Sequence, residues 1–107
     1  MEILISWMSR VGGRERNEDA CGYWSDGGPV CCVLSDGAGG HGGGDVASRV
    51  AVDSVLHAFA AQPECSPVSV RGLIDGANRD VMQEQKRSEG VRDMRATLVV
   101  LGFDPDR

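Results

Sequence analysis

Residues 33–45 contain the side chains whose types and spacing best suit chemistry. They read Val-Leu-Ser-Asp-Gly-Ala-Gly-Gly-His-Gly-Gly-Gly-Asp, so an apolar run leads into one carboxylate, Asp36, and then into an almost bare backbone. Because glycine has no Cβ, such a loop lets a carboxylate, backbone carbonyls and a ligand approach one another closely. An aspartate at the end of an apolar strand is held on a rigid element, which suits a metal ligand or a catalytic base.

A charged cluster, residues 14–19 with the sequence Arg-Glu-Arg-Asn-Glu-Asp, lies upstream. Hard divalent cations such as Mg²⁺ or Mn²⁺ prefer oxygen ligands, often one or two carboxylates completed by waters and backbone carbonyls. If the two loops converge, they offer a ligand set of this kind: Asp36, the Gly37 carbonyl, Glu18 and Asp19. Arg14 adds a planar guanidinium that grips phosphate oxygens in pairs. Since a metal-bound water is a nucleophile at phosphorus, we predict metal-assisted phosphate chemistry here.

The glycines also allow other interpretations. The spacing Gly37-x-Gly39-x-x-Gly42 matches a dinucleotide-binding fingerprint, but Asp36 would repel the pyrophosphate and the expected ribose-binding acid is missing. A Walker A loop is excluded because no Gly-Lys-Ser/Thr follows the glycines. Asp36 and the acidic pair upstream could instead be turn residues, and Asp45 is interpreted as a helix cap rather than a ligand.

Hydrophobic patterning predicts six elements that must position these loops. Strands are expected over 2–9, 20–25, 30–35 and 96–103, and helices over about 45–62 and 69–88. Asp-Gly-Gly-Pro before residue 30 is typical of a hairpin turn. The strand that follows it is apolar on both faces, which indicates a central position. The order strand, strand, strand, helix, helix, strand predicts an α+β fold with helices covering one face of a sheet.

Each helix is expected to bury one apolar stripe. The stripes are Ala47, Val50, Ala51, Val55 and Ala58 in the first helix, and Val70, Leu73, Ile74, Ala77 and Val81 in the second. Arg49, Asp53 and Leu56 should face away from the first stripe, and His57 at its edge is interpreted as structural.

Composition narrows the class of protein. With 107 residues and 41% hydrophobic content, residues 1–107 have the size of one small domain. The net charge of −5 argues against a nucleic-acid binder. No apolar run approaches the roughly 20 residues of a membrane span, and the start lacks the parts of a signal peptide, so we expect a soluble, cytoplasmic protein. The cysteines form no CxxC pair and are interpreted as reduced core residues: Cys21, Cys31, Cys32 and Cys65.

Two motifs carry a family resemblance. Arg14-x-x-Asn17-Glu18-Asp19-Ala20, then residues 33–41 followed by Gly-Asp-Val-Ala-Ser at 44–48, resemble the opening motifs of the PPM-type (type 2C) metal-dependent Ser/Thr protein phosphatases. The bacterial branch is the most similar. Residues 95–101, Arg-Ala-Thr-Leu-Val-Val-Leu, resemble the family's next strand. The matches follow the family order over nearly the whole chain, which therefore resembles the N-terminal half of that domain.

The resemblance implies a role for each matched residue. Asp36 would bridge two metal ions, Mn²⁺ or Mg²⁺, and the Gly37 carbonyl would bind one of them. Glu18 would reach that ion through water, and Asp19 would support the same cluster. Arg14 would hold the phosphate of a phosphoserine or phosphothreonine. The implied fold is half of an α-β-β-α sandwich, and the implied partners are phosphorylated Ser/Thr proteins, including a cognate kinase or its substrates.

The chain departs from the family pattern in two respects. Ala38 stands where some members have a histidine that acts as general acid, and His41 is expected to be a loop residue rather than its replacement. The later Gly-Asp-Ser/Thr-Arg, Asp-Gly and Asp-Asn motifs are missing. We therefore expect half of an active site, negligible activity of the isolated chain, and self-association through exposed sheet edges. The alternatives are a non-catalytic phosphate-, metal- or partner-binding remnant and, less favoured, the dinucleotide-binding module.

Overall fold

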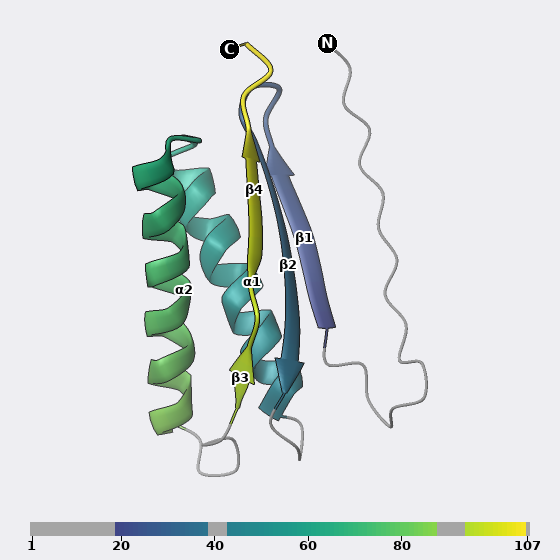
Figure 1. The fold of residues 1–107 in the computed structure, drawn as a ribbon, viewed down its shortest axis with the longest axis vertical. Coiled ribbons are helices and arrows are strands. Elements are labelled where there is room, and N and C mark those ends of the chain that lie inside the picture. Colours follow the sequence, from purple (N-terminus) through teal and green to yellow (C-terminus); the bar gives the residue numbers. More distant parts are fainter. Residues whose placement is uncertain (1–18, 39–42, 88–93, 107) are drawn as a thin grey trace.

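The structure is a computed structural model of the chain, and it describes residues 19–38, 43–87 and 94–106. Within these ranges the elements follow the order strand, strand, helix, helix, strand, strand (Figure 1). They are β1 (Asp19–Ser25), β2 (Val30–Ala38), α1 (Gly43–Ala61), α2 (Pro67–Arg87), β3 (Arg95–Ala96) and β4 (Val99–Phe103). The predicted strand over 2–9 lies outside the described residues.

One antiparallel sheet organises the described part of the chain, and β2 is its central strand. β1 pairs with one edge of β2, while β3 and β4 pair with the other. The β1–β2 turn is tight because Gly27 adopts a φ of 103°, a left-handed conformation that a side chain would strain. In the same turn, the Gly28 N–H donates to the Asp26 carboxylate at 3.3 Å. The predicted hairpin and the central position of its second strand are therefore confirmed.

Both helices lie on one face of the sheet, with α1 against β1 and β2 and α2 beside α1 (Figure 1). The core forms between α1 and the sheet, where Cys31, Val33, Val55 and Phe59 are buried. Phe59 meets the Trp24 ring of β1 edge-on, with centroids 5.7 Å apart and an interplanar angle of 71°. The α+β fold with helices on one sheet face is confirmed.

The buried face of α1 is wider than the predicted stripe. Ala58 is exposed, whereas Val52 and Phe59 are buried and Leu56 packs against the core. The prediction that Leu56 faces away is wrong because α1 packs against β1 as well as β2. At Gly22 of β1, an added Cβ would lie only 2.9 Å from Leu56 Cδ1, so the missing side chain makes room for the helix.

The strand boundaries also differ from the prediction. β2 continues to Ala38 because β3 pairs with its last two residues. The single strand predicted over 96–103 is divided into β3 and β4, with Thr97 and Leu98 between them. Both pieces pair with β2, β3 with Gly37 and Ala38 and β4 with residues 30–34, so the regular pairing is interrupted only at Thr97 and Leu98.

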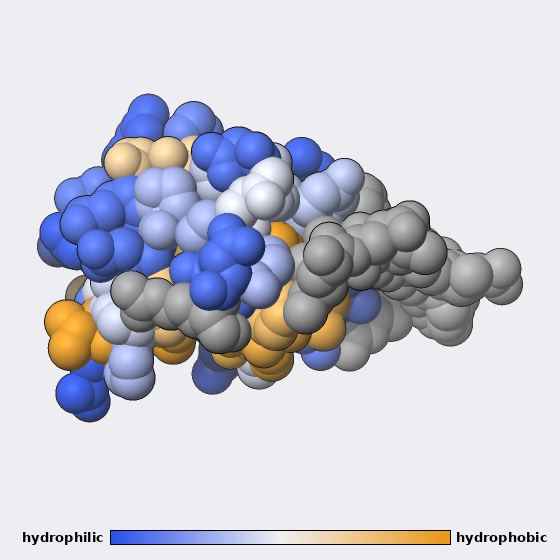
Figure 2. Space-filling model, turned by 90° about the horizontal axis from the view of Figure 1, so that it is seen from above, coloured by the Kyte–Doolittle hydropathy of each residue, from blue (hydrophilic) through white to orange (hydrophobic). Residues whose placement is uncertain are grey.

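The sheet face opposite the helices is apolar and open in the described part of the chain. Leu34 is 55% exposed, and the register places Cys21 and Val99 directly beside it. Further large exposed side chains on this face are Tyr23, Leu101 and Phe103. Figure 2 shows apolar patches at the surface of the described residues. None of the helices in these ranges is long and apolar enough to cross a bilayer.

Candidate metal and phosphate site

The site begins with two carboxylates that lie side by side on the neighbouring strands β1 and β2. Asp36 lies near the end of β2, and the β1–β2 register places Asp19 directly opposite. Directly opposed residues of an antiparallel pair point to the same face, with their Cβ atoms about 4.5–5.5 Å apart. Both residues are exposed, at the start of β1 and near the end of β2, and these strand ends lie at the lower end of the sheet in Figure 1. The strand pairing therefore brings together two candidate ligands that are 17 residues apart in the sequence.

The segment between β3 and β4 fixes the backbone at Asp36. The Thr97 N–H donates to the Asp36 carbonyl at 2.9 Å. In return, the Asp36 N–H donates to Thr97 Oγ1 at 3.3 Å. Next to them, the Ser35 hydroxyl donates to the Thr97 carbonyl at 2.7 Å, and the Ser35 side chain is fully buried. These bonds hold the backbone that carries the Asp36 carboxylate.

Gly37 follows Asp36 on the same strand. It is buried and lies opposite Ala96 of β3. Because Gly37 is held in a paired strand, its carbonyl has a fixed position relative to the Asp36 carboxylate. Ala38 comes next; it is exposed and lies opposite Arg95. This is the position at which some members of the family that the sequence resembles have a histidine.

Helix α1 starts close to this end of the sheet. The structure begins the helix at Gly43, two residues before the predicted start, so Asp45 lies in the first turn rather than at its boundary. A carboxylate in the first turn stabilises a helix through the helix dipole. The Ser48 hydroxyl donates to the Asp45 backbone carbonyl at 3.3 Å. This position supports a helix-terminal role for Asp45.

Two residues of the predicted site, Arg14 and Glu18, lie outside the described residues, as does the predicted loop residue His41. Among the residues that the structure describes, no group of three or more His, Cys, Asp or Glu side chains is arranged to hold a metal ion. Asp19, Asp36 and the Gly37 carbonyl form a partial set of hard oxygen donors, which fits the preferences of Mg²⁺ or Mn²⁺.

Ser35 and Thr97 were not identified as site residues from the sequence. Their bond joins residues 62 positions apart, and local patterning contains no information on such a pairing. The available signal was a polar residue, Ser35, inside an otherwise apolar strand, because a buried hydroxyl needs a hydrogen-bond partner.

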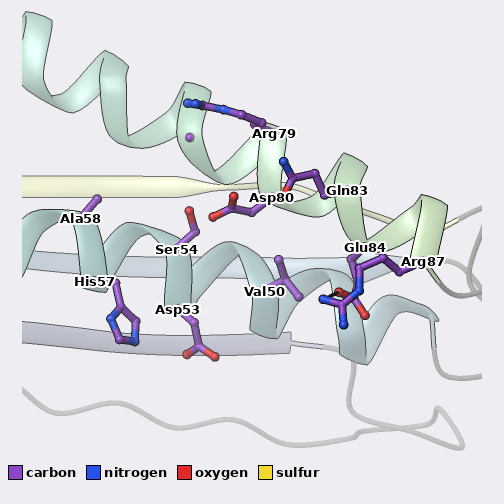
Figure 3. Close-up of a pocket in the computed structure, with 11 residues that line it drawn as sticks. Val50, Asp53, Ser54, His57, Ala58, Arg79, Asp80, Gln83, Glu84 and Arg87 are labelled. Carbon is purple, nitrogen blue, oxygen red and sulfur yellow. Dashed lines mark ion pairs between the residues drawn. The ribbon is translucent and has the colours of Figure 1, made fainter.

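A groove lies between the two helices, on the other side of the sheet from Asp36. It has a volume of about 690 Å³ and carries charged groups of both signs (Figure 3). Glu84 and Arg87 of α2 form an ion pair at 3.6 Å within it, and Asp53 and His57 of α1 line it as well. The exposed His57 therefore belongs to the helical surface and not to the site on the sheet.

The family model for protein phosphatase 2C matches residues 9–107. No curated protein matches the chain. Among solved structures, a bacterial serine phosphatase bearing an arginine-to-alanine mutation superposes with a TM-score of 0.76 at 27% identity, covering 87% of this chain and 45% of that one.

Two further solved structures share the fold. Serine/threonine phosphatase Stp1 from Staphylococcus aureus has a TM-score of 0.73 and 24% identity, covering 92% of this chain and 41% of that one. The Mycobacterium tuberculosis serine/threonine phosphatase PstP/Ppp has a TM-score of 0.64 and 23% identity, covering 86% and 38%. The chain thus spans less than half the length of these proteins. Because the family model covers nearly all of its residues, the chain belongs to the protein phosphatase 2C family.

Proposed function

We propose that this chain contributes one side of a metal-dependent active site that hydrolyses phosphoserine and phosphothreonine in proteins. The observation that supports this most is the Asp19–Asp36 pair, two exposed carboxylates placed opposite each other by the β1–β2 ladder. They lie beside a backbone held by Thr97, in a chain of the protein phosphatase 2C family. Fixed carboxylates of this kind suit a site that must keep its ligand geometry during catalysis.

The proposed ligands of Mn²⁺ or Mg²⁺ are the Asp36 carboxylate, the Gly37 carbonyl, Asp19 and, through water, Glu18. When bound, such ions lower the pKa of coordinated water and stabilise negative charge on a phosphoryl group. Asp36 is the proposed shared ligand of two ions, and its paired backbone keeps its carboxylate in place. Arg14 is proposed to bind the phosphate of the substrate through paired N–H groups.

The proposed substrates are phosphorylated Ser/Thr proteins, among them a cognate kinase or its substrates. The solved relatives are more than twice as long as the matched part. With two carboxylates in the described site, we propose that the 107-residue chain alone turns over substrate negligibly. The second candidate function is a non-catalytic phosphate-, metal- or partner-binding module, and the Asp19–Asp36 pair supports its metal-binding form.

Hydrolysis of p-nitrophenyl phosphate with Mn²⁺ tests the proposal. We expect negligible turnover by the 107-residue chain, and Mn²⁺-dependent turnover by a longer protein that supplies further aspartates. In that longer protein, Asp36→Asn should abolish activity. Asp53→Asn is the matched control because Asp53 is an exposed carboxylate on α1. Full activity of the Asp36→Asn protein would overturn the proposed role of Asp36. Robust turnover by the 107-residue chain would overturn the proposal that it contributes only one side of the active site.

A further inference from the structure

Cys65 lies against β4 at the end of the sheet far from Asp36, beside the strand position opposed to Cys31. Cys65 lies in the connection between α1 and α2, and its side chain covers Gly102 of β4. A Cβ added to Gly102 would lie 3.2 Å from Cys65 Sγ and 3.4 Å from Cys65 Cβ. The sulfur of Cys65 therefore occupies the space that a side chain at position 102 would take.

That space adjoins Cys31. In the β2–β4 register, Gly102 lies directly opposite Cys31, so a side chain there would point to the same face of the sheet as the Cys31 side chain. Opposed positions have Cβ atoms about 4.5–5.5 Å apart, and a disulfide needs Cβ atoms about 3.5–4.5 Å apart. Cys65 lies against the position opposed to Cys31 and acts electrostatically on the Cys31 thiol, so the two side chains are neighbours in space and a disulfide would require them to move closer together.

The other cysteines are badly placed for pairing. Cys32 adjoins Cys31 in the sequence, but successive strand residues point to opposite faces. Cys21 lies opposite Leu34 rather than Cys32, and such diagonal positions are about 7–8 Å apart. None of the four cysteines forms a disulfide in the structure. On geometry, Cys31 and Cys65 are therefore the favoured pair.

Exposure sets the order in which these two thiols would react. Cys65 is half-buried and lines a surface hollow of about 760 Å³ together with Pro63 and Phe103. Cys31 is fully buried, and burial, with smaller contributions from Cys32 and Cys65, raises the pKa of its thiol to about 11. An oxidant therefore reaches Cys65 first. Cys31 stays a protonated thiol, which is a poor nucleophile, and reacts only with an oxidised sulfur placed next to it.

We propose that Cys65 is a modification site that a hydroperoxide oxidises and that Cys31 then converts into a reversible Cys31–Cys65 disulfide. In the first step the Cys65 thiol takes one oxygen from the hydroperoxide, which leaves as an alcohol or water, and becomes a sulfenic acid. In the second step Cys31 sulfur attacks the Cys65 sulfur, and the hydroxyl leaves as water with the Cys31 proton. Both thiols are thereby oxidised by two electrons in total, and the hydroperoxide is reduced.

The bond would tie the α1–α2 connection to the central strand. Cys31 and Asp36 are five residues apart on β2, about 17 Å at the rise of a strand. The disulfide therefore leaves the carboxylate pair untouched and acts on the opposite end of the sheet.

Trypsin offers a direct test, because the sequence places the other three cysteines in one peptide, residues 17–49, and Cys65 in the next, residues 50–71. The protein is treated with hydrogen peroxide, the remaining thiols are alkylated, and the digest is analysed by mass spectrometry. We expect an intact mass lower by about 2 Da and a linked pair of these two peptides that dithiothreitol separates. The Cys21→Ser/Cys32→Ser double variant should still form the link.

Gly102→Ala is the variant that tests the geometry. Its new Cβ would displace the Cys65 side chain, so the link should form about tenfold more slowly. Gly72→Ala is the matched control, because nothing lies within 4 Å of a Cβ at that position in α2, and it should form the link at the original rate. A peptide 17–49 linked only within itself, or Cys65 converted to sulfinic acid without any link, would overturn the proposal. Both outcomes are readable on the unsubstituted protein if a variant fails to fold.

Discussion

Replacing Ser35 with alanine tests how the structure holds Asp36 in place. The Ser35 hydroxyl is fully buried and donates to the Thr97 carbonyl at 2.7 Å. A hydrogen bond of this kind contributes about 1 kcal/mol net, and leaving a fully buried polar group without a partner costs about 1–3 kcal/mol, so this part-buried bond belongs toward the lower end of that range. We therefore expect Ser35→Ala to lower the free energy of unfolding by about 1–2 kcal/mol, measured by urea denaturation followed by circular dichroism.

The same substitution should weaken metal binding without removing a ligand. Thr97 also bonds the backbone of Asp36, so loosening Thr97 loosens the proposed ligand. Mutation of a residue that orients a metal ligand typically lowers metal affinity by about 10–100-fold. Ser35 acts on Asp36 only through the backbone of Thr97, so we expect an effect near the lower limit of this range. We expect Mn²⁺ affinity to fall by about tenfold or somewhat less, measured by isothermal titration calorimetry.

Ser48→Ala is the matched control. Ser48 is also buried and also donates to a backbone carbonyl, that of Asp45, but at 3.3 Å and within the first turns of α1. Its loss should cost less than about 1 kcal/mol and leave Mn²⁺ affinity unchanged. If Ser35→Ala and Ser48→Ala have the same unfolding free energy and the same Mn²⁺ affinity, the proposed support of Asp36 by Ser35 and Thr97 is wrong.

Two further predictions concern the core and the open face of the sheet. The pKa of Cys31 is raised from 9.0 to about 11 by burial, then by Cys32 and Cys65, so between these pH values the unfolded chain binds fewer protons than the folded chain, and stability falls as pH rises. Each pH unit is worth at most about 1.4 kcal/mol, and because the thiol is only half titrated at each end of this range we expect a loss of about 2 kcal/mol between pH 9 and pH 11. Cys31→Val should largely remove this loss, and equal slopes for both proteins would contradict the prediction. On the open face, Leu101 is 62% exposed, so Leu101→Lys should reduce self-association of the chain in sedimentation-velocity runs, because it places a charge in the apolar surface. A monomeric unsubstituted chain at the same concentration would refute that prediction.

Local sequence signals were sufficient for the helices and the hairpin. The turn residues before Val30 and the continuous apolar run that follows them identified a central strand, and both helix ranges fall within two residues of the structure. Asp36 was placed at the end of an apolar strand, and it lies near the end of β2. These features depend on neighbours in the sequence, which is why they could be predicted.

Features that depend on distant pairing could not be predicted in the same way. β2 extends to Ala38 only because β3 pairs with it. Leu56 of α1 is partly buried against the core because a glycine of β1 leaves room there. The hydrogen bonds of Thr97 to Ser35 and Asp36 join residues more than 60 positions apart. From the sequence, Asp19 and Asp36 could share a site only if their two loops converge. The structure shows that the β1–β2 pairing places Asp19 directly opposite Asp36.

Mn²⁺ binding at Asp36 is the most direct test of the proposed site. A titration of the chain with Mn²⁺, followed by electron paramagnetic resonance of the free ion, compares the unsubstituted chain with Asp36→Asn and with Asp53→Asn on α1. The paired carboxylates of Asp19 and Asp36 predict that Asp36→Asn weakens binding by at least about tenfold, whereas Asp53→Asn binds like the unsubstituted chain. Equal Mn²⁺ affinity in all three proteins would contradict the account.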